Sequence, residues 1–400
     1  NMSNDTRPEI RFPGFTEDWE ERKLIDLVVR LNKSTNSSRL PKVEFEDIVA
    51  GEGRLNKDVS QKFDNRKGIE FLPNDILYGK LRPYLKNWLK ATFTGVAIGD
   101  FWVFRAKKSD SDFIYSLIQA DRYQKAANDT SGTKMPRSDW KKVSDTVFYI
   151  PNDLKEQQKI GIFFKKLDDT IALHQRKLDL LKETKKGFLQ KMFPENGAKV
   201  PEIRFPGFTE DWEERKLGEL GKTQSGIGFP DAEQGGSEGT PFFKVSDMNN
   251  IGNEYEMRNA NHYVSNEQIE RKKWKPIKDV PAIIFAKVGA AIMLNRKRLV
   301  TSPFLIDNNT MAYLFNNTWD IYFGKILFET INLPRYSQVG ALPSYNSSDI
   351  ENISVKVPVK DEQQKIGTFF KQLDDTIALH QRKLDLLKET KKSFLQKMFV

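Results

Sequence analysis

Mostly apolar residues recur at alternating steps of four and three along residues 160–192. This is the spacing of the a and d positions of a coiled coil, and it persists for more than four heptads. The pattern predicts one helix between Lys155 and Met192, roughly 57 Å long at 1.5 Å per residue, with Pro151 before it and Pro194 after it. The predicted seam consists of Ile160, Phe164, Leu167, Ile171, His174, Leu178, Leu181, Lys185, Phe188 and Met192.

The same helix occurs a second time. Residues 156–194 align with residues 362–400 at an offset of 206, and only four of the 39 positions differ. So narrow an apolar stripe needs a partner helix, and the duplicate is the obvious one. The second seam consists of Ile366, Phe370, Leu373, Ile377, His380, Leu384, Leu387, Lys391, Phe394 and Met398.

A shorter repeat indicates how the chain closes. "PEIRFPGFTEDWEERKL" stands at 8–24 and again, without a change, at 201–217, directly after the first helix. We therefore expect residues 8–24 to lie beside Met398 at the end of the second helix, in a nearly circular chain with pseudo-twofold symmetry and antiparallel helices. His174 and His380 would then lie close together, and a polar pair that sets the helix register is favoured over a metal or pH role.

Two blocks of unrelated sequence, at about 25–155 and 218–361, separate the repeats. Both are mixed α/β, with strand patterns such as "DTVFYIP" and "NISVKVP" just before each long helix. The predicted fold class is α/β (mixed α+β), with two globular domains and two long helices packed as an antiparallel coiled coil. The predicted division of the chain is 1–154, 155–194, 195–361 and 362–400.

Composition narrows the class of protein. The chain of 400 residues has a net charge of +9 and a pI of about 9.2, which favours a polyanionic partner such as nucleic acid. The absence of cysteine excludes disulfides and cysteine-based zinc or iron–sulfur sites. Without a signal peptide or an apolar run of about 20 residues, we expect a cytoplasmic protein.

The sequence contains little catalytic material. It has no G-x-x-x-x-G-K-[ST] phosphate loop, and two of its three histidines lie on the helix seams. The pair Asp168–Asp169 recurs as Asp374–Asp375, but adjacent helical residues face about 100° apart and cannot form a matched acid/base pair. We interpret these four carboxylates as a solvated or partner-facing acidic patch. We predict no catalytic, cofactor-binding or metal-binding residue.

Basic residues mixed with aromatic ones are the strongest candidates for binding. In "YGKLRPYLKNWLK" they alternate along the chain and would share one face of an extended strand, although Pro83 must bend it. "SGTKMPRSDW" and, in the second block, "QVGALPSYNSSDI" and "NRKR" add polar and basic side chains that suit phosphates and base edges. The predicted DNA-binding residues are Lys80, Arg82, Tyr84, Lys86, Trp88, Thr133, Lys134, Arg137, Lys244, Lys287, Asn295, Arg296, Arg298, Ser344, Tyr345 and Asn346.

The whole pattern resembles the specificity (S) subunit of type I restriction–modification systems. The matching pieces are "PEIRFPGFTEDWEERKL", "NDILYGKLRPYLKNW", "GDFWVFR", "SGTKMPRSDW" and the "P…EQQKI…LD" start of each helix. In that family the variable blocks are target recognition domains, each reading one half of a bipartite DNA sequence, and the paired helices set the spacing. "YGKLRPYLKNW" has no convincing counterpart in block two; "IIFAKVGAAIMLNRKR" is the nearest, with Lys287 placed like Lys80.

The resemblance implies a non-catalytic chain with catalytic partners. Two copies of a methylation subunit would bind it and transfer a methyl group from S-adenosylmethionine to adenine, and restriction subunits would add ATP-driven translocation and cleavage. Two other interpretations remain. One is a duplicated coiled-coil scaffold whose two modules bind proteins; the other is a self-sufficient DNA enzyme, although no glycine motif followed by (N/D)PP(Y/F) is present. Methylation measured with the chain alone would distinguish the enzyme from the specificity subunit and the scaffold, since neither of those two should methylate DNA.

Overall fold

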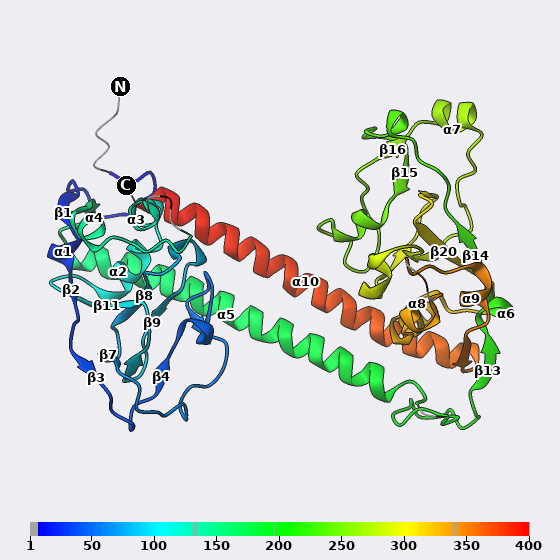
Figure 1. Ribbon diagram of the computed structural model, residues 1–400, viewed down its shortest axis with the longest axis horizontal. Coiled ribbons are helices and arrows are strands. Elements are labelled where there is room, and N and C mark those ends of the chain that lie inside the picture. Colours follow the sequence, from blue (N-terminus) through cyan, green and yellow to red (C-terminus); the bar gives the residue numbers. More distant parts are fainter. Residues whose placement is uncertain are drawn as a thin grey trace. The chain divides into compact units, whose positions relative to one another are not determined.

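The computed structural model describes residues 7–130, 132, 134–195, 197–338, 340 and 342–399. The chain forms two compact units (Figure 1). Unit 1 comprises Asn1–Leu178 and His380–Val400, and unit 2 comprises Asp179–Leu379. Each unit therefore contains one variable block together with part of each long helix, because both helices continue from one unit into the other.

Unit 1 contains small sheets and short helices, and its strand pairs are antiparallel except for β10 and β4, which are parallel. Strand β1 (Glu20–Lys23) pairs with β12 (Val147–Ile150). A four-stranded sheet has the order β2 (Val28–Arg30), β11 (Phe101–Ala106), β8 (Ile76–Gly79), β9 (Trp88–Lys90), and a second has the order β3 (Ser34–Thr35), β7 (Gly68–Phe71), β10 (Gly95–Ala97), β4 (Lys42–Val43). The remaining elements are β5 (Ile48–Val49), β6 (Arg54–Leu55), α1 (Leu24–Leu27), α2 (Ser111–Leu117), α3 (Asp121–Asn128), α4 (Trp140–Asp145), η1 (Phe45–Asp47) and η2 (Pro83–Leu85).

Unit 2 repeats this plan. Strand β13 (Glu213–Lys216) pairs with β21 (Ser354–Val357), and the main sheet has the order β14 (Gly221–Ser225), β20 (Thr310–Phe315), β17 (Ala282–Ala286), β18 (Lys297–Val300). A three-stranded sheet has the order β16 (Tyr263–Val264), β15 (Thr240–Phe243), β19 (Leu305–Ile306). The helices are α6 (Leu217–Leu220), α7 (Asn266–Lys272), α8 (Ile321–Thr330), α9 (Ser347–Glu351), η3 (Asp231–Glu233), η4 (Val245–Asn249), η5 (Ala290–Leu294) and η6 (Leu333–Tyr336).

The variable blocks thus share a fold although their sequences look unrelated. The helix after the main sheet begins the same way in both, because Asp110 accepts a hydrogen bond from the Phe113 N–H and Asp320 from the Phe323 N–H, each at 2.9 Å. A shared pattern of buried strands and capped helices is enough to specify the topology without sequence identity.

The two long helices are present as predicted. Helix α5 spans Leu154–Lys191 and α10 spans Lys360–Met398. Within unit 1 they run antiparallel, since Phe163 contacts Phe394 with ring centroids 4.9 Å apart while His174 lies beside His380. All predicted seam residues are buried or half-buried, which confirms the heptad assignment.

Helix pairing in unit 2 follows the same direction. Phe188 contacts Phe369 with ring centroids 5.0 Å apart, and Lys185 pairs with Asp374 at 2.8 Å. The residue numbers of one helix rise as those of the other fall, so the antiparallel prediction is confirmed within each unit.

The short repeats fasten the helix ends. The Ile10 N–H donates to the carbonyl of Lys397 at 3.0 Å in unit 1, and the Ile203 N–H donates to the carbonyl of Lys191 at 2.8 Å in unit 2. The first short repeat therefore lies at the end of α10, as expected. Each repeat also holds the start of the other helix, because Arg11 binds Glu156 and Arg204 binds Glu362 through two hydrogen bonds each.

Candidate functional site

The first basic segment forms a hairpin connection rather than one extended strand. Strand β8 ends at Gly79 and β9 begins at Trp88, which pairs back with Tyr78. Arg82 and Lys86 turn the chain because both adopt left-handed conformations, with φ of 49° and 56°. The prediction that alternate residues share one strand face is therefore wrong.

The hairpin divides its predicted DNA contacts into two groups. Arg82, Tyr84 and Lys86 are exposed at the turn, and Lys80 is half-buried beside it. Trp88 is only 4% exposed and belongs to the hydrophobic core of unit 1. Trp88 was predicted to face DNA, and this prediction is wrong because the register of β9 turns its ring into the core.

The second basic segment of block one lies against this hairpin. The Arg82 N–H donates to the carbonyl of Pro136 at 2.7 Å, and the Ser138 N–H donates to the carbonyl of Lys80 at 2.8 Å. Lys134 and Arg137 are exposed, and Arg137 pairs with Asp100 at 3.0 Å. Two segments about 50 residues apart in the sequence thus form one basic loop pair. Thr133, also predicted to bind DNA, lies outside the described residues.

Block two builds the same loop pair with other side chains. The Gly289 N–H donates to the carbonyl of Pro343 at 2.8 Å, and the Tyr345 N–H donates to the carbonyl of Lys287 at 3.0 Å. Gly289, whose N–H corresponds to that of Arg82 in unit 1, also has a positive φ, of 89°. The backbone contacts of Lys287 match those of Lys80, which confirms that the two lysines are placed alike.

Four predicted contacts of block two have positions or partners within the fold. Tyr345 is 3% exposed and lies in the core of unit 2, and Asn346 caps α9 by accepting from the Asp349 N–H at 2.9 Å. Asn295 uses both atoms of its amide on backbone groups at 331–333. Arg298 donates to the carbonyl of Asn253 at 2.6 Å, and burial lowers its pKa. The burial of Tyr345 shows that its assignment to DNA is wrong, whereas contact of Asn295, Arg298 and Asn346 with DNA stays a prediction.

The remaining candidates of block two are less buried. Lys287, Ser344, Arg296 and Lys244 are half-buried, with Arg296 bonded to Asn249 and the Lys244 ammonium 3.3 Å from Gln234. The sequence interpretation missed two exposed residues of η6, Arg335 and Tyr336, which stand just before the bridge from Gln338 to Ser344. The sequence "LPRYSQ" combines an arginine with an aromatic residue, as "YGKLRPYLKNWLK" does, and this pattern could have identified them.

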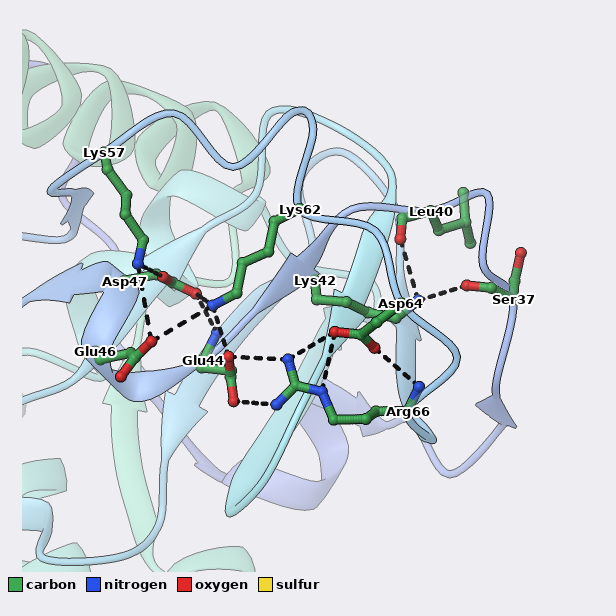
Figure 2. A network of polar contacts seen from close by, with 10 residues as sticks. All are labelled: Ser37, Leu40, Lys42, Glu44, Glu46, Asp47, Lys57, Lys62, Asp64 and Arg66. Atoms are coloured by element: carbon green, nitrogen blue, oxygen red, sulfur yellow. Dashed lines mark hydrogen bonds and ion pairs between the residues drawn. The ribbon is translucent and has the colours of Figure 1, made fainter.

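Three other cations of unit 1, Lys57, Lys62 and Arg66, pair with carboxylates of the same unit (Figure 2). The buried carboxylate of Asp47 lies 2.7 Å from the Lys62 ammonium and 2.9 Å from that of Lys57, and Arg66 bonds to both Glu44 and Asp64. The guanidinium of Arg66 lowers the pKa of the Glu44 carboxyl. Because each of these cations has an internal acidic partner, the network is a poor candidate for phosphate contact.

The acidic patch on the long helices is only half as predicted. Asp374 is 3% exposed and pairs with Lys185, and Asp168 pairs with Lys391 at 2.6 Å. Burial raises the pKa of Asp168, against the opposing effect of Lys391. The prediction of a partner-facing role is therefore wrong for these two residues. Asp169 and Asp375 are exposed, each paired one helical turn back with a lysine.

A second apolar stripe shares the face of these exposed aspartates. Leu173 and Leu180 lie four and eleven residues after Asp169 and are 44% and 68% exposed. Their duplicates Leu379 and Leu386 are 58% and 63% exposed. Leucines seven residues apart on an exposed helix face indicate a surface for another helix. The seven-residue spacing of these leucines is visible in the sequence, but the sequence analysis considered only the buried seam.

The two seam histidines meet as expected. In unit 1 the Nδ1 atoms of His174 and His380 are 3.1 Å apart. Desolvation, with the nearby charge of Lys383, lowers the pKa of His174. Within the described residues, no cluster of three or more histidine, aspartate or glutamate side chains is suitably placed for a metal ion.

Acidification is expected to destabilise unit 1 through this pair. Because the folded pKa of His174 lies below its ordinary value of 6.5, the folded state binds fewer protons than the unfolded state, and the free energy of unfolding falls as the pH drops below about 6.5. Chemical denaturation between pH 5 and pH 8 checks this. The double variant His174→Asn/His380→Asn keeps a polar pair without titration, and an unchanged pH dependence in that variant would contradict the assignment.

The comparisons with known proteins agree with this architecture. The family model described as "Type I restriction modification DNA specificity domain" matches residues 16–183 and 209–389, once in each half of the chain. The chain is 24% identical over 314 residues to the type I restriction enzyme MjaVIII specificity subunit of Methanocaldococcus jannaschii, covering 72% of this chain and 68% of that protein.

Solved structures share the fold. The S subunit of a type I restriction–modification system from M. genitalium superposes with a TM-score of 0.67 at 14% identity, covering 98% of this chain and 99% of that one. A chain from a study of type I R-M complex assembly and conformational transition gives a TM-score of 0.52 at 17% identity, with 94% and 96% covered. In the part of the chain that the structure describes, no helix has the length and apolar character needed to span a membrane. Because the family model matches most of the chain, once in each half, this chain belongs to the type I restriction–modification DNA specificity family.

Proposed function

We propose that the chain reads a bipartite DNA sequence, with one half-site for each unit. The observation that carries this proposal is the loop pair, which has the same backbone hydrogen bonds in both units but different side chains. Unit 1 presents Arg82, Lys86 and Lys134 there, whereas unit 2 presents Lys287 and Ser344. A common docking geometry with unlike contact residues suits two unlike half-sites.

The tip of each hairpin adds apolar side chains to this surface. Tyr84 and Leu85 are 57% and 39% exposed in unit 1, and Met293 and Leu294 are 65% and 58% exposed in unit 2. Exposed apolar groups beside lysine and arginine fit a duplex groove, where cations neutralise phosphates and apolar atoms contact base edges. This combination favours DNA over a purely protein-binding scaffold.

The spacing between half-sites is assigned to α5 and α10. Both helices continue from one unit into the other, and their seams are identical at all ten positions. A continuous helix pair transmits a defined separation because each residue adds about 1.5 Å. We propose that the length of these helices sets the number of unread base pairs.

Two identical methylation subunits are the proposed partners, and restriction subunits are further ones. The exposed stripe of Leu173, Leu180, Leu379 and Leu386 occurs twice in the same sequence context, which suits two copies of one partner. S-adenosylmethionine would bind to the methylation subunit, and this chain would aim the reaction. Since the target is genomic DNA, the proposed place of action is the cytoplasm.

Methyladenine mapping tests the proposal. The chain is co-expressed with the methylation subunit of its host in cells whose genome lacks that mark. We expect a new bipartite motif with a fixed gap, and exchanging one variable block should change one half of the motif only. A stable complex that produces no methyladenine would instead favour the scaffold interpretation.

A further inference from the structure

A closed ring of ion pairs joins the helices of unit 2 to their variable block. The Lys185 ammonium lies 2.8 Å from Asp374 and 2.6 Å from Glu329. The Lys325 ammonium lies 2.5 Å from Asp374 and 3.2 Å from Glu329. The side chains of Lys185, Lys325 and Asp374 are 8%, 5% and 3% exposed, so three of the four charges are buried.

The ring has two sources in the sequence. Lys185 of α5 and Asp374 of α10 belong to the duplicated helices and are called the frame pair here. Lys325 and Glu329 lie one turn apart on α8, which belongs to the variable block, and are called the module pair. The ring of Tyr255, also from the variable block, lies about 5 Å from both ammonium groups (5.1 and 5.0 Å).

Unit 1 contains the same frame pair with a different module pair. Lys391 and Asp168 are the duplicates of Lys185 and Asp374, and they pair at 2.6 Å. The Lys391 ammonium also donates to the Gln119 side-chain oxygen at 2.6 Å. Gln119 therefore occupies the place that Glu329 has in unit 2.

Tyr115 occupies the place of Lys325. The caps Asp110 and Asp320 align the two helices, and Tyr115 follows its cap by five residues as Lys325 does. Burial, with a smaller contribution from Asp168, raises the pKa of Tyr115 well above its ordinary value, so this side chain is neutral.

The two module pairs differ in chemistry but agree in charge. The pair Lys325/Glu329 brings one positive and one negative charge, and the pair Tyr115/Gln119 brings none. Each module pair is therefore neutral in sum, and each leaves the frame pair balanced. A module with only the lysine or only the glutamate would leave one charge buried without a partner, which is strongly destabilising.

We infer that the module pair decides which variable blocks the duplicated helices accept: a block fits when the residues five and nine positions after its helix cap have zero net charge. The charge rule concerns the contact between a variable block and the duplicated helices within one unit. It does not rest on the proposed reading of DNA, and it applies to any block placed in either position.

Substitutions of nearly unchanged shape test the charge rule in unit 2. Lys325→Met and Glu329→Gln each remove one charge of the ring, and the double variant removes both. We expect each single change to lower the equilibrium ratio of folded to unfolded protein on the order of 10- to 100-fold in chemical denaturation. The double variant should lose less than the product of the two single losses.

The reverse change in unit 1 is the matched control. Gln119→Glu adds a carboxylate beside Lys391 and Asp168 without a cation to balance it, so it should destabilise the protein as Glu329→Gln does. If the protein simply preferred glutamate or glutamine at this place, Gln119→Glu and Glu329→Gln would change stability in opposite directions. The inference is overturned if the double variant is as unstable as the product of the single losses or fails to fold, or if Gln119→Glu leaves stability unchanged.

Discussion

Replacing Leu173, Leu180, Leu379 and Leu386 by glutamine is expected to reduce the affinity for the methylation subunit by at least about 100-fold. These side chains are 44–68% exposed, so they add little to the fold of either unit. Buried in an interface, each leucine contributes on the order of 1.5 kcal/mol or more, and four of them account for more than a hundredfold change. Co-purification and titration of the two subunits measure the effect.

The control uses the same new residue on another face of the same helices. Lys186→Gln and Lys392→Gln change exposed positions outside the leucine stripe and should leave assembly unchanged. Thermal unfolding of the leucine variant should match that of the native chain. Normal assembly of the leucine variant would exclude this stripe as the partner surface.

Arg82→Ala and Lys134→Ala are each expected to weaken DNA binding about 10-fold. Both side chains are exposed on the loop pair of unit 1 and have the reach of a phosphate contact. Losing one phosphate contact should lower the slope of log K against log salt concentration by about one, and similarly for all sequences. Titration of a duplex that contains the mapped motif, at several salt concentrations, measures both quantities.

Arg66→Ala supplies the comparison for these variants. Arg66 is also an exposed arginine of unit 1, but its guanidinium bonds to Glu44 and Asp64 (Figure 2). We expect its loss to leave affinity and salt slope unchanged. Equal behaviour of Arg66→Ala and Arg82→Ala would show that net charge alone, and not the loop pair, accounts for binding.

Side-chain direction in the variable blocks was the part that sequence analysis predicted least well. Trp88 was assigned to DNA because basic and aromatic residues alternate around it, yet the turn at Arg82 and Lys86 sends it into the core. A left-handed turn formed by non-glycine residues has no reliable sequence signal. Tyr345 was misassigned for a related reason, since its burial depends on the neighbouring strand and helix.

In the duplicated helices, sequence analysis predicted the position of some side chains correctly and that of others incorrectly. The heptad spacing identified His174 and His380 as a facing pair, and their Nδ1 atoms are 3.1 Å apart. The same helices carry Asp168 and Asp374, which an isolated helix would expose. Lys391 and Lys185 draw them inward only when the antiparallel partner is in place.

By itself, the sequence determined the two long helices, their seam and the docking of the first short repeat at the end of α10. Heptad spacing is a local property, and an exact repeat shows directly which segments must occupy equivalent places. Only the tertiary structure decided that two unrelated blocks form the same loop pair, and that a charged and a neutral module pair balance the same frame pair. Those outcomes depend on contacts between residues distant in sequence. The two halves share backbone hydrogen bonds and a balance of buried charge, although their residues differ.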